Sequence, residues 1–441
     1  MDNNDILPLT WAQKAWQAGP HGDAFDLYWR HDCSMPFRRS VRLDASSVKA
    51  AAQQAISRHA VLRSAAVHPS VDEIVQTVLP EDISDDLLFR ELDEADVGAR
   101  GRDVVDVFLR IDKNYGPNLA VALVHGPSGS TLWLKAAHFV LDGAGMAMLA
   151  RQIMDEGATP EARCSSAQHL EIVAWERGKR AGISSQRGIE KWCEHSRRAC
   201  ETGAASRLAD AAMCSVADGS SAPLMRTSAA LAGRFGVPQS AILLSLFLVA
   251  YGNVSAAGSA WVAICSANRV LPCELDYVGL QTRNGSLFLD FRDDNEHFGS
   301  LTRRVAAGLV GATRNARHDP PRLLEEADRH GLPVDPPLFF NTAVFPPPGR
   351  AADAVHTVDS ESGDFDDLTW REAPQGRYAL EMNFHNFGSR VGLTVEHSPQ
   401  FISRDGVSSV VKALTLAGRF LSGSTESVRL GDIRSALSDS S

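Results

Sequence analysis

The 441-residue chain has few cysteines, no hydrophobic run long enough for a membrane span and no excess of positive charge. Its seven cysteines are scattered and no pair has C-x-x-C spacing, so the sequence predicts neither a structural zinc site nor a disulfide framework. The first residues are acidic and polar, unlike a secretory signal. The longest apolar run, residues 241–251, is typical of a buried helix. We therefore expect a cytoplasmic protein with reduced thiols and no membrane partner.

The formal net charge is −10 at pH 7. Nucleic-acid binding proteins usually present a basic surface, so this charge argues against a nucleic acid as partner. An acidic partner would have to dock on a local basic patch, for which Arg177, Lys179, Arg180, Arg197 and Arg198 on two consecutive expected helices are the candidates. The sequence contains no glycine-rich phosphate loop, no G-x-S-x-G elbow and no H-E-x-x-H motif. We expect no metal, nucleotide or redox cofactor.

The composition that remains is that of a soluble globular protein, with 44% hydrophobic and 22% charged residues. Residues 1–200 alternate expected helices and strands, and residues 224–441 do the same. Residues 201–223 are rich in Ala, Ser and Gly and are the expected linker. Neither half has the regular βαβ rhythm of a doubly wound chain, so we expect a mixed α/β (α+β) fold of two units. The main expected elements are helices over 9–18, 43–58, 165–179, 186–200, 224–235, 238–251 and 297–317, strands over 104–111, 119–124, 131–137 and 260–266, and a long loop over 346–371.

The most informative segment is residues 137–143, which read Ala-His-Phe-Val-Leu-Asp-Gly. It follows an expected strand and precedes an expected helix, so His138 is held at the end of a rigid element. A neutral imidazole titrates near neutrality, which makes a positioned histidine a candidate general base for an amine or a hydroxyl. The alternative is a structural histidine, because H-x-x-x-D-G also occurs by chance.

Further segments, in order along the chain, resemble motifs of the condensation domains of nonribosomal peptide synthetases. Residues 7–16, Leu-Pro-Leu-Thr-Trp-Ala-Gln-Lys-Ala-Trp, resemble the S/T-x-A-Q motif, and residues 58–64, Arg-His-Ala-Val-Leu-Arg-Ser, resemble R-H-x-x-L-R-T/S. Residues 137–143 resemble H-H-x-x-x-D-G, with Ala137 where the family usually has its first histidine. Residues 169–175 resemble Y-x-D-x-x-x-W, Lys191-Trp192 resembles a Tyr-Trp pair, and residues 263–269 and 278–286 resemble the strand and the I-G-x-x-x-N-T region of the other lobe.

This resemblance spans residues 7–421. It implies two chloramphenicol-acetyltransferase-like lobes that form a V-shaped pseudo-dimer with an active-site tunnel between them. It also implies a carrier-bound acyl or aminoacyl thioester as donor, delivered on a phosphopantetheine arm, and a small-molecule or carrier-bound amine as acceptor. The sequence contains no adenylation domain and no L-G-G-x-S carrier segment, so we expect a free-standing condensation enzyme of natural-product biosynthesis, with an amide product preferred over an ester. The alternatives are an acyl-CoA-dependent acyltransferase of the same superfamily and a non-catalytic recruitment domain.

The resemblance also implies roles for residues of this sequence. His138 would orient or deprotonate the nucleophile, and the backbone amide of Gly143 would lie near the developing oxyanion. Asp142 would be structural and held by an arginine, with Arg63 as the first candidate and Arg58 beside it. The alternative for both arginines is a solvated position. Possible tunnel residues are Trp192, Gln281 and Asn284, and the alternative for the tryptophan is the core.

Overall fold

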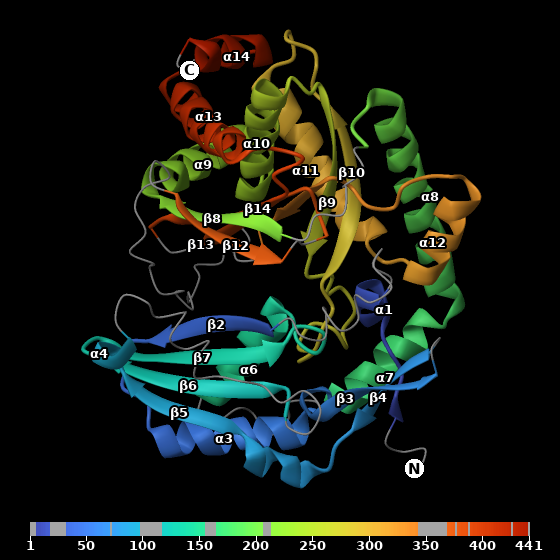
Figure 1. The fold of residues 1–441 in the computed structure, drawn as a ribbon, viewed down its shortest axis with the longest axis vertical. Coiled ribbons are helices and arrows are strands. Elements are labelled where there is room, and N and C mark those ends of the chain that lie inside the picture. The colour runs from blue at the N-terminus through green and yellow to red at the C-terminus, as the bar shows by residue number, and fades with distance from the viewer. Residues whose placement is uncertain are drawn as a thin grey trace.

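The computed structural model describes residues 6–17, 32–70, 73–97, 117–154, 165–205, 213–342, 368–374, 377–386, 389–424 and 427–439. Each half of the chain forms a lobe built on a β-sheet, and the two sheets face each other with helices on their outer sides (Figure 1). The expected mixed α/β fold of two lobes is therefore confirmed. The expected strand over 104–111 and most of the expected loop over 346–371 lie outside the described residues.

The N-terminal lobe is built on a four-stranded sheet in the order β2-β7-β6-β5. Strands β6 (Leu119–Gly126) and β7 (Gly129–Ala137) form an antiparallel hairpin, as the Gly- and Pro-containing turn between them predicts. Helices α3 (Ala45–Arg58) and α6 (Gly143–Met154) pack against one face of this sheet and bury its leucines. The remaining elements are β1 (Ile6–Leu7), α1 (Trp11–Gln17), β2 (Asp32–Arg39), η2 (Ala60–Arg63), β3 (Ser64–Ser70), β4 (Glu73–Val78), η3 (Glu81–Asp86), β5 (Leu88–Asp93) and α4 (Glu94–Val97), of which β1, β4 and β3 form a small separate sheet.

Two helices, α7 (Ser165–Glu176) and α8 (Lys179–Thr202), connect the lobes along one side of the molecule (Figure 1). The sequence predicts a break between 179 and 186, whereas α8 is continuous from Lys179 because only the tolerated Gly182 interrupts its helix-forming residues. Arg180 and Arg197 are therefore about 25 Å apart along one helix, at 1.5 Å per residue. The basic residues at the two ends of α8 do not form the single patch that two consecutive helices suggested.

The expected linker over 201–223 contains a strand. Residues Met213–Ser221 form β8, which pairs with β14 on one side and β12 on the other. Its alanine, serine and glycine residues have weak strand preference, so local composition concealed it. Neighbouring strands supply the hydrogen bonds that make it part of the sheet.

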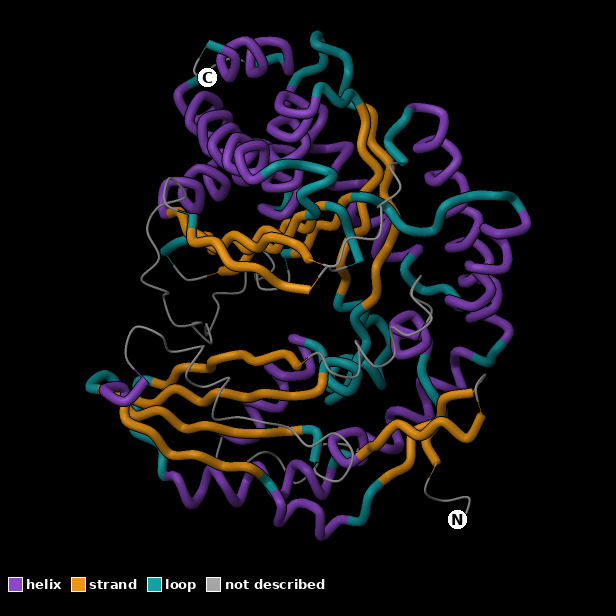
Figure 2. Tube along the Cα trace, in the orientation of Figure 1, coloured by secondary structure: helices purple, strands orange, loops and turns teal. Residues whose placement is uncertain are grey.

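The C-terminal lobe is built on a seven-stranded mixed sheet in the order β10-β9-β11-β13-β14-β8-β12. Helices α9, α10, α11 and α13 cover its outer face (Figure 2) and enclose the largest apolar core. The predicted buried helix within residues 238–251 is confirmed, since α10 is buried on nearly every side. The elements are α9 (Ala222–Phe235), α10 (Gln239–Ser255), β9 (Ser259–Ser266), β10 (Arg283–Asp290), α11 (Phe298–Asn315), α12 (Pro320–Arg329), β11 (Leu338–Asn341), β12 (Thr369–Pro374), β13 (Leu380–Asn386), β14 (Val391–His397), α13 (Arg404–Gly423) and α14 (Leu430–Ser438).

In the described part of the chain, no single helix is both long enough and apolar enough to cross a membrane. Only α9 and α10 taken together reach that length and composition, and they meet at an angle of 109°.

Candidate active site

The turn that carries His138 joins the end of β7 to the start of α6. His138 follows Ala137, the last residue of β7, and Gly143 is the first residue of α6. The backbone amides of Val140 and Leu141 donate to the Ala137 carbonyl at 2.9 and 3.2 Å, which fixes the turn. A histidine in the place of Ala137 would lie in the N-terminal core, because the alanine is fully buried among apolar residues.

His138 is partly buried. Burial lowers the pKa of its imidazole, and the backbone hydrogen bonding of the turn and the nearby charge of Asp142 offset only part of that effect. The ring is therefore neutral at physiological pH. A neutral imidazole can accept a proton, which is the property that a general base requires.

Asp142 is the most heavily bonded carboxylate of the site and is 1% exposed. Arg269 donates to both of its oxygens, at 2.8 and 3.0 Å. The backbone amide of Gly145 donates to Oδ1 at 2.7 Å, and the amides of Gln281 and Thr282 donate to Oδ2, both at 2.8 Å. The Thr282 hydroxyl adds a sixth bond at 3.0 Å. Burial alone would raise the pKa of Asp142, but Arg269 and these amides outweigh it and hold the pKa below its usual value.

The partner of Asp142 is therefore Arg269 of the C-terminal lobe, and the prediction of Arg63 was wrong. Arg63 is the buried last residue of η2, and its Nε donates to the Ile56 carbonyl in the last turn of α3 at 3.2 Å, while its guanidinium also bonds the Leu79 carbonyl. It satisfies carbonyls that the last turn of the helix leaves open. Arg58 lies in that same last turn and is partly buried, so neither arginine is simply solvated.

Two glycines at the start of α6 differ in what their surroundings require. A Cβ at Gly143 would meet only the Met35 sulfur, at an ordinary contact distance of 3.5 Å. A Cβ at Gly145 would lie 2.9 Å from the Gly279 carbonyl oxygen, because the two lobes approach closely here. Packing thus requires glycine at 145 and not at 143. The amide of Gly143 belongs to the first helical turn, where N–H groups lack helical partners and can stabilise an anion.

The three residues expected in the tunnel have different environments. Trp192 is 5% exposed, packs with Ile189 and Trp261, and its Nε1 donates to the Val334 carbonyl at 3.0 Å. It fastens α8 to the C-terminal lobe and has the environment of a core residue, and its place in a tunnel stays a prediction. Gln281 is fully buried, and within the described part of the chain neither of its side-chain amide atoms has a hydrogen-bond partner. Asn284 is partly buried and donates to the Tyr378 hydroxyl at 2.6 Å.

Sequence reasoning missed several residues that hold the site. Gln13, inside the S/T-x-A-Q-like motif, donates to the Phe139 carbonyl at 3.4 Å and exchanges side-chain hydrogen bonds of 3.0 and 2.9 Å with Gln76. His169 lies between the Tyr277 hydroxyl and the Pro8 carbonyl, at 2.8 and 2.7 Å. The motifs marked these segments, and only the folded structure shows what the individual side chains contact.

Two buried arginines of the C-terminal lobe, Arg283 and Arg317, contact the connecting helix α7. Glu176 of α7 pairs with Arg283 of β10 and also accepts the Trp11 amide at 2.9 Å. Burial raises the pKa of Glu176 despite this pairing. Arg317 pairs with Glu274 at 2.8 Å and lies 4.2 Å from the centre of the Trp175 ring. These contacts hold α7 against the C-terminal lobe.

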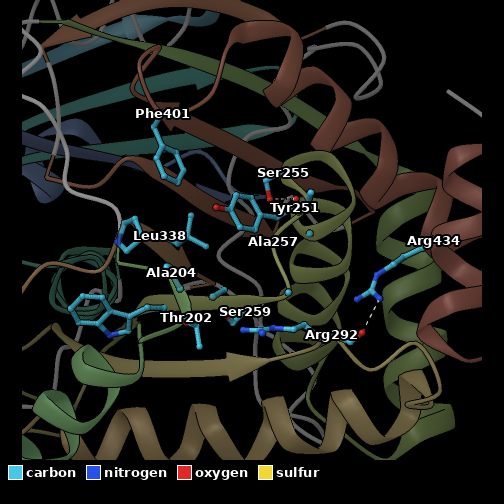
Figure 3. A pocket seen from close by; sticks show the side chains of 17 residues that line it. Thr202, Ala204, Tyr251, Ser255, Ala257, Ser259, Arg292, Leu338, Phe401 and Arg434 are labelled. Atoms are coloured by element: carbon cyan, nitrogen blue, oxygen red, sulfur yellow. Dashed lines mark hydrogen bonds between the residues drawn. The ribbon is translucent and has the colours of Figure 1, made fainter. Parts of the chain in front are cut away.

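A surface pocket of about 700 Å³ lies elsewhere in the C-terminal lobe, between the end of α8, the end of α10 and the start of β9 (Figure 3). Tyr251, Ser259 and Arg292 are among its lining residues. Strand β9 rises about 3.3 Å per residue, so Ser259 lies about 23 Å from Ser266, the end that leads to Arg269. The pocket is therefore separate from the His138 site. Among the described residues, no group of three or more His, Cys, Asp and Glu side chains could hold a metal ion.

No family model matches the chain, and no curated protein matches it either. Its structure is similar to that of the first condensation domain of the calcium-dependent antibiotic synthetase, with a TM-score of 0.70 and 15% identity over 96% of this chain and 98% of that one. It is also similar to the condensation domain that mediates chain release from the enacyloxin polyketide synthase, with a TM-score of 0.68 and 16% identity over 96% and 84% of the two chains. The chain has a condensation-domain fold.

A third similar structure is the starter condensation domain of rhizomide synthetase in complex with C8-CoA, with a TM-score of 0.68 and 14% identity over 97% of each chain. The V-shaped pseudo-dimer that the resemblance implied is thereby confirmed as a fold. In this condensation-domain fold, the turn that carries His138 is fixed by Asp142 to residues of the opposite lobe.

Proposed function

We propose that the protein is an acyltransferase of the condensation type, which joins an acyl or aminoacyl thioester to an amine and, with lower preference, to a hydroxyl. One observation carries this proposal. A neutral imidazole, His138, is held on a turn that six hydrogen bonds to Asp142 fix between the two lobes. Such fixation is far stronger than a solvated surface turn requires.

In this proposal, the His138 imidazole accepts a proton from the nucleophile as its nitrogen or oxygen attacks the thioester carbonyl. The carbonyl oxygen becomes negative, and the first amides of α6, including that of Gly143, stabilise that charge. The carbon–sulfur bond then breaks, and the proton held by His138 passes to the leaving thiolate. Asp142 takes no part in proton transfer, because its paired, charged form is favoured.

The donor is proposed to be an acyl group on the phosphopantetheine arm of a carrier protein. A CoA donor is the second candidate, and the similar domain bound to C8-CoA favours it. Matched acyl-carrier and acyl-CoA donors, compared at equal concentration with one amine acceptor, separate the two. Equal or faster turnover with CoA would replace the carrier by CoA in the proposal.

The catalytic role is tested against a non-catalytic recruitment role by His138→Ala, with product formation followed by mass spectrometry. Removing a general base is expected to lower the rate about 100-fold or more. The matched control is His330→Ala, because His330 is exposed at the C-terminal end of α12, where its ring bonds Glu326 on the surface of the same helix. Unchanged product formation by His138→Ala would contradict catalysis.

A further inference from the structure

The C-terminal sheet presents a polar face toward the N-terminal lobe. Along β13, the even-numbered Met382 and Phe384 are buried in the apolar core, while Glu381, Asn383 and His385 on the other face are only partly buried. Along β14, Leu393 and Val395 are buried and Thr394 and Glu396 are partly exposed. Helices cover the first face (Figures 1 and 2), so the partly exposed side chains lie on the face of the sheet that is turned toward the N-terminal lobe.

Strand register aligns these side chains into one row across the sheet. The polar row, as we call it, consists of Asn284, Cys265, Asn341, Asn383, Thr394 and Asp218 on six adjacent strands. Neighbours in the row are hydrogen-bonded: Asn341 Nδ2 donates to Asn383 Oδ1 at 3.1 Å, and the Thr394 hydroxyl donates to Asp218 at 2.6 Å. All six side chains are partly buried, neither packed away nor fully solvated.

The row is rich in hydrogen-bond acceptors. The Oδ1 atom of Asn341 is buried, and no donor in the described part of the chain reaches it. Beside the row, Glu381 and Glu396 lie directly opposite each other on β13 and β14. Burial first, and then the facing Glu396 carboxylate, raise the pKa of Glu381 to about 8. Two facing carboxyl groups and an unbonded carbonyl form a surface that gains from a ligand with N–H or O–H groups.

The row also begins next to the His138 turn. Asn284, the first member of the row, lies on β10 directly opposite Cys265 of β9 and two residues after Thr282. Asp142 is four residues from His138 and is held by the amides that precede β10. A substrate whose reacting group is at His138 can therefore extend along the row.

We propose that the polar row binds the non-reacting part of a substrate and selects one with two or more hydrogen-bond donors over one with a plain alkyl chain. This rests on the proposed function, since it assigns a substrate class to the same site. The donors can belong to the acceptor molecule or to the acyl chain of the thioester, and the two sources share the same chemistry.

Two pairs of probes of matched size distinguish these sources. As acceptors, 3-amino-1,2-propanediol is compared with pentylamine, and as acyl donors, 3,5-dihydroxyhexanoyl is compared with octanoyl on N-acetylcysteamine. The wild-type protein is expected to favour the hydroxylated member about tenfold or more in kcat/KM in at least one pair, as one or two hydrogen bonds in a partly buried site would give. Asn383→Leu is expected to remove most of that ratio.

Thr394→Val is a second test of the row, and Thr313→Val is its matched control. The same isosteric change is made on the row in one variant and on helix α11, outside the row, in the other. Thr394→Val should reduce the ratio and Thr313→Val should not. The proposal would be overturned by equal kcat/KM values for both members of each pair, or by a kcat/KM ratio that Asn383→Leu leaves unchanged.

Binding of each hydroxylated probe alone, followed by ligand-observed NMR, tests the row without turnover. Binding weakened by Asn383→Leu and unaffected by His138→Ala would support the row even if no product forms and the proposed function fails. The proposal for the row would be overturned if the wild-type protein bound the hydroxylated and alkyl probes equally well and Asn383→Leu changed neither affinity.

Discussion

Replacing Asp142 with asparagine keeps the size of the side chain and removes the charge that six donors surround. Whichever carboxylate oxygen becomes NH₂, its hydrogens then face other hydrogens, from Arg269 and Gly145 at Oδ1 or from four donors at Oδ2. Arg269 keeps its charge with its side chain only 6% exposed. Breaking a buried pair in this way costs about 3–5 kcal/mol, so we expect Asp142→Asn to lower the free energy of unfolding by that amount.

The assay is urea unfolding followed by tryptophan fluorescence, in a double-mutant cycle. Asp142→Asn combined with Arg269→Met should show a coupling of about 1–3 kcal/mol, since the two side chains are in contact. Asp142→Asn combined with Arg63→Met should be additive within about 0.5 kcal/mol. The exposed Asp290→Asn is the control, with an expected change below about 1 kcal/mol, because its ion pair with Arg292 is solvated and 3.9 Å long.

Equal coupling of Asp142 to Arg63 and to Arg269 would refute the assignment, and so would a loss below 1 kcal/mol for Asp142→Asn. The pH dependence has a definite sign. The pKa of Asp142 is lowered on folding, so its contribution is present above the unfolded-state pKa of about 3.9 and is lost as pH falls through the folded-state value. The difference between wild type and Asp142→Asn should therefore shrink on acidification below about pH 4.

Gly145→Ala should lower Tm by several degrees, because its Cβ meets backbone of the other lobe, while Gly143→Ala, whose Cβ has room, should leave Tm nearly unchanged; equal shifts would contradict the packing. Burial lowers the pKa of His138, and the neutral ring is the active form. With a hydroxyl acceptor, which does not titrate in this range, kcat/KM should therefore stay high down to a pH below 6.5, and an acid limb above 6.5 would be inconsistent with this. Gln13 is 2% exposed, and Gln13→Ala removes its hydrogen bonds to Gln76 and Phe139. The free energy of unfolding in urea should therefore fall by about 1–3 kcal/mol, and a change below 0.5 kcal/mol would show that Gln13 does not hold the turn.

Local sequence patterns predicted the parts of the fold whose causes are local. The hairpin β6–β7 follows from two apolar runs separated by Gly-Pro-Ser-Gly. The turn at His138 was placed for the same reason. Strand β8 escaped prediction because its small residues carry no strand signal of their own, and partners more than 140 residues away make it a strand.

The site divides in the same way. His138 and Gly143 could be identified from one heptapeptide, whereas Arg269 could not be paired with Asp142 because 127 residues separate them. Arginines are common in the chain, and charge alone offers no means to choose among them. Trp192 illustrates a different difficulty. Its position in a motif suggested the active site, whereas its neighbours in the structure form a core between α8 and the C-terminal lobe.

Buried ion pairs help to join the two lobes. Asp142–Arg269 links the His138 turn to the C-terminal lobe and Glu176–Arg283 links α7 to β10, and both pairs are nearly inaccessible to solvent. Buried pairs lose much of their attraction to desolvation, so they add little net stability compared with apolar residues of the same volume. They do impose geometry, because each carboxylate is satisfied in only one arrangement of its donors. Since Asp142 follows His138 by four residues and takes three of its four partners from the other lobe, the orientation of the imidazole depends on how the lobes are set relative to each other.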